Sequence, residues 1–128
     1  MNTGYLNTLP EVANKYNVSL QEGEKVVFTA KLTTFGTEKD FRLGADDSMF
    51  TLTNRRIIAD NGYGVWSVDI LEDVVSCKKI KSMLVFTYFQ IMLNKTIVFD
   101  DGSLSLTGFN FYFKKSDTAK FESIMNNL

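Results

Sequence analysis

Short strand-like segments separated by tight turns dominate the middle of this 128-residue chain and restrict it to a mainly β fold. The first three of these segments are Met49–Leu52, Arg56–Asp60 and Gly64–Ile70, with turns at Thr53-Asn54 and Asn61-Gly62. Asn-Gly between two strand-like runs is a strong signal for a β-hairpin. Strands joined by such short turns are antiparallel neighbours. This region therefore predicts an antiparallel sheet.

Strand-like alternation extends on both sides of this region. Upstream, Lys25–Phe35 places apolar residues at every second position, which predicts a half-buried strand. Gly36–Asp47 has no periodicity, and we predict a loop there. Downstream, the predicted strands are Val74–Ile80, Leu84–Leu93, Thr96–Asp100 and Ser103–Phe113, with a turn at residues 100–103 and a possible break at Gly108.

Both ends of the chain show helical periodicity. Thr8–Tyr16 has an apolar stripe at i, i+3, i+4 and i+7, with capping-box spacing between Thr8 and Glu11 and with Pro10 in the first turn. These features predict a short N-terminal helix. A second stripe follows Lys115, where Ser116 is a suitable N-cap, and consists of Phe121, Ile124, Met125 and Leu128. It predicts a C-terminal helix that docks on the sheet.

These elements define the expected fold class. Seven or eight hairpin-joined strands form an antiparallel sheet that is rolled or folded on itself, with the C-terminal helix over one open end. The Leu84–Leu93 strand has apolar residues on both faces. Its second face should therefore lie under a helix or in an oligomer contact.

Composition narrows the function. The chain is long enough for one domain with its own core. It has no histidine and one cysteine, Cys77, which argues against common forms of nucleophilic catalysis and indicates a reducing compartment, the cytoplasm by default. A net charge of −1 argues against nucleic acid as a partner. The acidic pairs lie where turns already favour aspartate, so we expect no metal, no cofactor and no enzymatic activity.

Three segments together carry a resemblance to a known family. They are LQEGEKVVFTAKL at Leu20–Leu32, LTNRRII at Leu52–Ile58 and VWSVDILEDVVS at Val65–Ser76. The chain resembles a GRAM-type or bacterial pleckstrin-homology-like domain from residue 20 to 128, with residues 1–19 as an N-terminal extension. The resemblance implies a two-sheet antiparallel barrel capped by the C-terminal helix, and a binding role without catalysis.

The resemblance also implies where a ligand would bind. Pleckstrin-homology domains hold lipid phosphates with basic residues of the first strand and the following loop, and the matching residues here are Lys31, Lys39 and Arg42. Arg55 and Arg56 lie in the family's turn, where they either orient the turn through carboxylates or contact a partner. On the Val74–Ile80 strand and just beyond it, Lys78, Lys79 and Lys81 either protect a sheet edge or form an anion patch.

Three functions remain open at this stage. The first is a binding module that acts through protein contacts or self-association, as the two-faced strand indicates. The second is a peripheral membrane module that binds anionic phospholipid head groups, with Phe41 and Leu43 dipping into the interface. The third is a small barrel that holds an apolar ligand.

Overall fold

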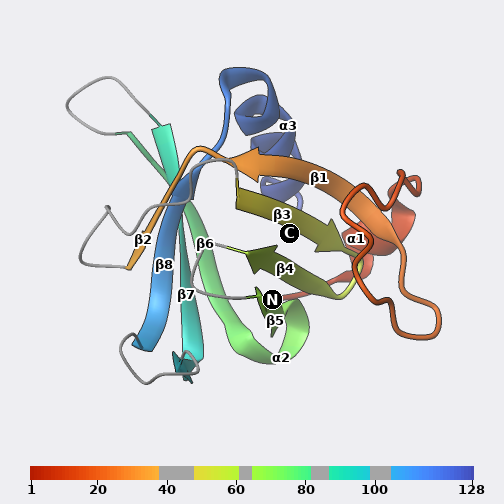
Figure 1. Cartoon of the computed structure of the whole chain (residues 1–128), viewed down its shortest axis with the longest axis horizontal. Helices are drawn as coiled ribbons and strands as arrows, with labels where there is room; N and C mark the ends of the chain where they lie inside the picture. Colours follow the sequence, from red (N-terminus) through yellow and green to blue (C-terminus); the bar gives the residue numbers. More distant parts are fainter. Residues whose placement is uncertain (38–47, 61–64, 82–86, 99–104) are drawn as a thin grey trace.

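The computed structural model describes residues 1–37, 48–60, 65–81, 87–98 and 105–128 (Figure 1). These residues form eight strands and three helices and confirm the mainly β fold class. In chain order they are α1 Gly4–Thr8, β1 Val26–Leu32, β2 Thr34–Thr37, β3 Ser48–Thr53, β4 Arg56–Asp60, β5 Val65–Asp69, α2 Ile70–Asp73, β6 Val74–Lys81, β7 Thr87–Val98, β8 Ser105–Tyr112 and α3 Lys115–Met125.

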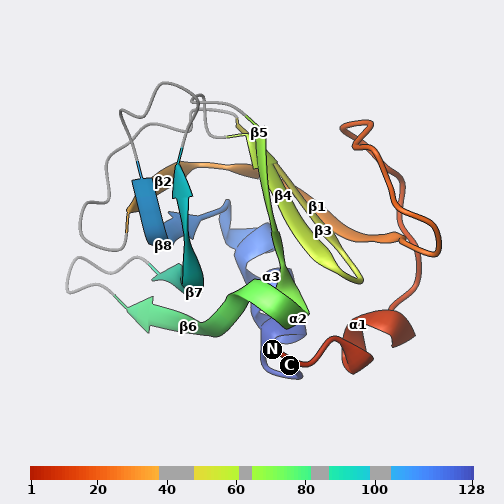
Figure 2. The ribbon, with the colours of Figure 1, turned by 90° about the horizontal axis from the view of Figure 1, so that it is seen from below.

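The strands form two antiparallel sheets of four strands each. The first sheet has the order β1-β3-β4-β5 and the second has the order β2-β8-β7-β6. Figure 2 shows the two sheets facing each other at an angle, with α3 at the opening between them. The predicted arrangement of two antiparallel sheets with a C-terminal helix is confirmed, and the described strands do not close into a continuous barrel.

The predicted strand Lys25–Phe35 belongs to both sheets. It divides at Thr33, so that β1 pairs with β3 in the first sheet and β2 pairs with β8 in the second. Thr33 donates its amide to the carbonyl of Tyr112, 2.9 Å away. β2 also includes Gly36 and Thr37, which we had placed in a loop. At the opposite corner, the short helix α2 joins β5 to β6 and begins at Ile70, the last residue of the predicted strand Gly64–Ile70.

The predicted N-terminal helix is wrong. The helix α1 lies earlier, at Gly4–Thr8, and no helix forms over residues 9–16. The backbone there has another partner, because the amide of Val12 donates to the carbonyl of Val26 at 2.9 Å. The residue that this part of the chain buries completely is Leu6, outside the predicted stripe.

Two further strand boundaries differ from the prediction. Leu84–Leu93 and Thr96–Asp100 were expected as separate strands, but β7 runs without interruption from Thr87 to Val98 and absorbs the irregularity as a register shift between Met92 and Ile97. β8 likewise continues through Gly108. The predicted turns at Asn61-Gly62 and residues 100–103 lie outside the described residues.

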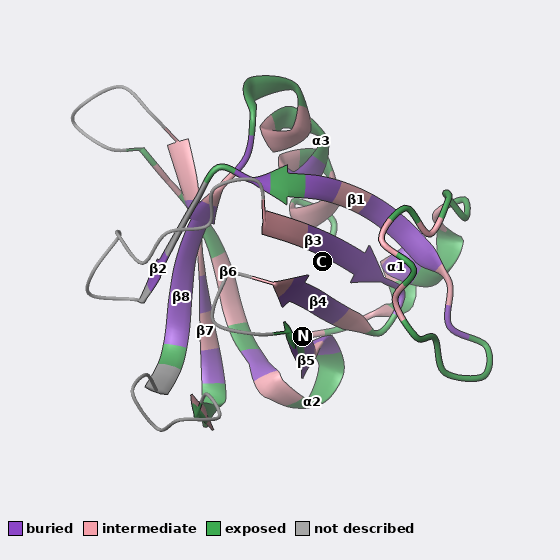
Figure 3. Cartoon of the chain, viewed as in Figure 1, coloured by how far each residue is buried: buried purple, intermediate pink, exposed green. Residues whose placement is uncertain are grey.

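Aromatic side chains fill the space between the sheets. Phe121 of α3 is fully buried, and its ring centroid lies 4.7 Å from that of Phe89 and 5.6 Å from that of Phe50. The neighbouring rings are Phe28, Phe109, Phe111 and Phe113. Figure 3 shows buried residues along the central strands of both sheets. The predicted docking of the C-terminal helix is confirmed, although α3 begins at Lys115 and has Lys114, not Ser116, as its N-cap.

Candidate functional site

The Leu52–Ile58 segment is a structural turn that fixes the start of β1. The Thr53 hydroxyl accepts hydrogen bonds from the amides of Arg55 (3.0 Å) and Arg56 (2.8 Å), which closes the turn between β3 and β4. Asn54 accepts from the amide of Lys25 at 2.9 Å and donates to the Asn7 side chain at 2.9 Å. The turn therefore also ties the N-terminal residues to the sheet.

Arg56 is held by a carboxylate. Its guanidinium donates to both oxygens of Glu24, with Nη2 to Oε1 at 2.6 Å and Nε to Oε2 at 2.8 Å. The Glu24 side chain is fully shielded from solvent. Burial alone would raise the pKa of Glu24, but hydrogen bonds from Arg56, Gln21 and Thr53 lower that pKa to about 2. Of the two alternatives left open for Arg56, the structure shows the carboxylate pair.

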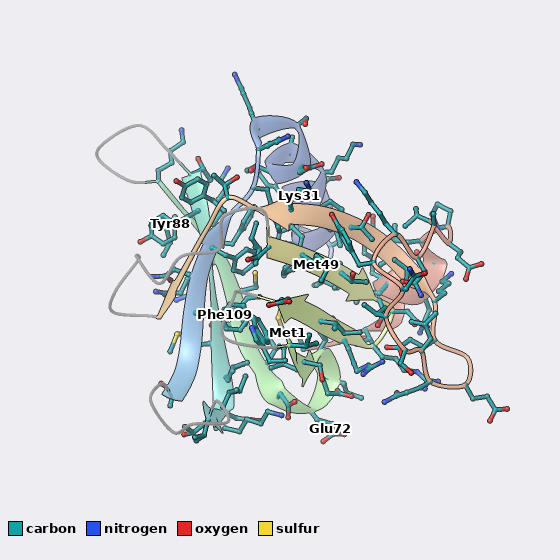
Figure 4. All side chains as sticks on the ribbon, viewed as in Figure 1. Met1, Lys31, Met49, Glu72, Tyr88 and Phe109 are labelled. Atoms are coloured by element: carbon teal, nitrogen blue, oxygen red, sulfur yellow. The ribbon has the colours of Figure 1, made fainter. Side chains whose placement is uncertain are left out.

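The predicted site residues that the structure describes do not lie together. Lys31 is exposed on β1, opposite Met49 of β3 in the register, and Figure 4 labels both residues. Arg55 is exposed in the turn after β3, at the opposite end of that strand from the pairing of Lys31 with Met49. Lys39 and Arg42 lie outside the described residues, as do Phe41 and Leu43.

The three lysines lie on an edge strand, as one of our two interpretations predicted. Among the described strands, β6 pairs with β7 alone and forms the margin of the second sheet (Figure 2). Lys78 pairs with Gln90 and Lys79 with Phe89, so that their side chains take opposite faces. All three lysines are exposed, and Lys79 forms an ion pair with Glu122 of α3 at 2.7 Å.

Apolar side chains accompany this edge. Leu71 of α2 is 59% exposed and Val75 of β6 is 61% exposed. Cys77 lies on the same strand, opposite Ile91, and burial raises the pKa of its thiol to about 12. A thiol with so high a pKa is a poor nucleophile at neutral pH.

A cavity of about 360 Å³ lies on the outer face of the first sheet. Its walls are the segment 16–19 on one side and strands β3, β4 and β5 on the other. The sequence analysis missed this cavity, because it placed Tyr16 on the buried stripe of a helix. Thr51 lies between the core residues Phe50 and Leu52 on β3 and therefore points away from the sandwich interior, but alternation alone cannot show what covers it.

Other kinds of site find no support in the described part of the chain. No three acidic or cysteine side chains there gather closely enough to hold a metal ion. None of the described helices has the length and apolar character needed to cross a membrane.

Comparison with solved structures identifies the fold. The Vps36 N-terminal PH domain is similar to this chain with a TM-score of 0.61 and 19% sequence identity, covering 92% of this chain and 89% of that one. The chain therefore has a pleckstrin-homology-like fold. No family model and no curated protein matches the sequence. The narrower resemblance to GRAM-type or bacterial domains stays a prediction.

Proposed function

We propose that this chain is a protein-binding module that takes an extended, acidic segment of a partner along the free edge of β6. The observation that carries this proposal is an eight-residue edge strand with lysines at three of its last four positions. A strand edge offers a row of backbone donors and acceptors to an incoming strand, which supplies affinity without a deep pocket.

The lysines determine which partners fit. A partner strand with acidic residues would meet Lys78 and Lys81, and opposite charges across neighbouring strands stabilise their pairing. A second copy of β6 would instead bring further lysines into the same interface, where like charges close together are unfavourable. This charge pattern favours a different acidic partner over self-association through this edge.

The neighbouring apolar residues extend the surface. Leu71 and Val75 lie at the start of the edge, where β6 leaves α2. An apolar side chain near the end of the partner segment could pack on them and lose contact with water. Because Lys78 and Lys81 lie on opposite faces of the strand, the proposed ligand is an extended segment with acidic residues at successive positions and an apolar residue near one end.

A synthetic peptide with consecutive glutamates and a valine near one end tests the proposal by titration into the isotopically labelled chain. We expect the largest NMR shift changes at amides of β6, slower hydrogen exchange there, and weaker binding as salt increases. A matched lysine and valine peptide should bind at least tenfold more weakly. Equal binding of the two peptides would contradict the proposal.

Charge reversal locates the contact. The double variant Lys78→Glu/Lys81→Glu should reverse the preference between the two peptides, whereas Lys31→Glu on the first sheet is the matched control and should leave it unchanged.

Vesicles containing anionic phospholipid test the head-group alternative in parallel. Vesicle binding that Lys31→Glu abolishes, together with no peptide binding, would overturn the proposal in favour of that alternative. Sedimentation that shows dimers sensitive to the double variant would favour self-association.

A further inference from the structure

We infer that the cavity under residues 16–19 binds a small, mostly apolar molecule that carries a hydrogen-bond acceptor such as a carbonyl group. This site is separate from the β6 edge, because it lies on the outer face of the first sheet. It also differs from the barrel interior considered in the sequence analysis, since phenylalanine side chains occupy the space between the sheets.

The cavity has the size and lining of a ligand site. Small-molecule pockets typically measure roughly 300–1,000 Å³ and combine apolar walls with a few polar groups. The apolar part of this wall includes Met49, Ile58 and Val65. Val65 is 71% exposed, the largest exposed fraction among the large apolar residues in the described chain. A bound apolar molecule would cover part of that surface.

Two hydroxyl groups in the lining residues supply the polar part. Thr51 is 1% exposed, and its Oγ1 atom has no hydrogen-bond partner within the described structure. The hydroxyl oxygen of Tyr16 is likewise buried and unpartnered within the described structure. The Tyr16 hydroxyl is protonated at neutral pH in any case, and burial together with the nearby charge of Asp117 raises its pKa further above the ordinary value of 10.0. Both groups can therefore donate a hydrogen bond.

An unsatisfied buried hydroxyl is costly, and a ligand can remove that cost. A buried donor without a partner loses its hydration and gains nothing in exchange. A carbonyl oxygen has two lone pairs and can accept from one or both hydroxyls after a small side-chain rotation. The free protein therefore has two hydroxyl donors, those of Thr51 and Tyr16, that a ligand acceptor can use.

Charge in the wall argues against an anionic ligand. Arg56 and Asp60 both line the cavity, but Glu24 already neutralises Arg56, so the carboxylate of Asp60 would repel an anion. The same guanidinium donates to the carbonyl of Ser19 at 2.9 Å, and Asn14 bonds both the amide and the carbonyl of Val18. These bonds hold the covering segment in place, so that the cavity is formed before a ligand arrives.

A matched pair of probes tests the inference. Acetophenone and ethylbenzene have the same carbon skeleton, but only acetophenone carries a carbonyl oxygen. In an NMR titration we expect acetophenone to shift amides of residues 16–19 and of β3 to β5, and to bind at least fivefold more tightly than ethylbenzene. Equal affinity for the two probes, or shifts centred elsewhere, would overturn the inference.

Variants separate binding from folding. Thr51→Val and Tyr16→Phe each remove one hydroxyl and should weaken acetophenone binding about fivefold without affecting ethylbenzene, while Thr33→Val and Tyr5→Phe serve as controls outside the cavity.

Ser67 is exposed at the cavity wall, so that Ser67→Phe should fold and should block both probes. Unchanged acetophenone affinity in Thr51→Val, Tyr16→Phe and Ser67→Phe would contradict the site. Lys78→Glu/Lys81→Glu should leave acetophenone binding intact, which keeps this test independent of the proposed peptide site.

Discussion

Glu24 carries a buried negative charge whose contribution to stability depends on pH. Its pKa in the folded chain, about 2, lies below the ordinary value of 4.5. A lowered folded pKa means that the ionised group stabilises the fold fully above the unfolded pKa, and that this stabilisation is lost as pH falls from about 4.5 toward 2.

We expect Glu24→Gln to lower the free energy of unfolding by about 3–5 kcal/mol at pH 7, because Arg56 is left without its buried partner. The difference from the wild type should shrink as the pH approaches 2. Urea unfolding at several pH values measures both effects, and Glu11→Gln at an exposed position is the control. A difference that stays constant with pH would contradict this account.

Removing the Thr51 hydroxyl should raise the free energy of unfolding, in contrast to Glu24→Gln. Thr51→Val keeps the shape of the side chain and removes a buried hydroxyl that has no partner in the described structure. We expect the variant to be more stable than the wild type by roughly 1 kcal/mol, measured by urea unfolding without any ligand. A loss of stability would show that the hydroxyl already has a partner, such as an ordered water molecule.

Prediction from sequence reached its limit at single residues where the partner is distant in the chain. Arg55 and Arg56 look equivalent in sequence, and alternation along a strand only says that they point in different directions. Their roles depend on Glu24, which lies 32 positions from Arg56. The role of Lys79 likewise depends on Glu122, which is 43 positions away in the sequence.

Among the elements, strands between tight turns were the easiest to predict. β3, β4 and β6 lie close to their predicted limits because a period of two and a short turn are both local signals. The helix over Thr8–Tyr16 failed because its stripe competes with a non-local partner: Val12 gives its amide to β1. The division of one predicted strand into β1 and β2 was also missed, although the alternation changes phase at the corner: the apolar series ends at Leu32, Thr34 is polar and Phe35 is apolar.

Gly108 shows why β8 can pass so close to β7. A Cβ atom at this position would lie 2.7 Å from Sδ of Met92 and 2.9 Å from the carbonyl oxygen of Ile91. We expect Gly108→Ala to destabilise the chain by about 1–3 kcal/mol in urea unfolding, because a backbone atom cannot move aside cheaply.

Adding Met92→Ala to Gly108→Ala should restore only part of this loss, since the Ile91 carbonyl remains. Gly4→Ala is the control, because its nearest neighbour is the flexible Asn2 side chain at 3.2 Å. Full recovery in the double variant would mean that the sulfur contact alone limits this position.

On the scale of the whole molecule, Phe121 joins α3 to both sheets. Its ring lies 5.6 Å from Phe28 of the first sheet and 5.7 Å from Phe111 of the second, measured between centroids. We expect Phe121→Ala to cost about 3–5 kcal/mol of unfolding free energy through the cavity that it leaves. Ile124→Ala, at a half-buried position, should cost clearly less. Similar losses in the two variants would show that α3 is held mainly by its outer contacts.

The passage of β1 into β2 through Thr33 has a thermal consequence. Because β1 and β2 belong to one continuous segment, detachment of the edge strand from one sheet disturbs the edge strand of the other. We therefore expect the two sheets to unfold together on heating. Calorimetry should then record one endotherm whose van't Hoff and calorimetric enthalpies agree. Inserting glycines at Thr33 should weaken this coupling between the two sheets and broaden the endotherm.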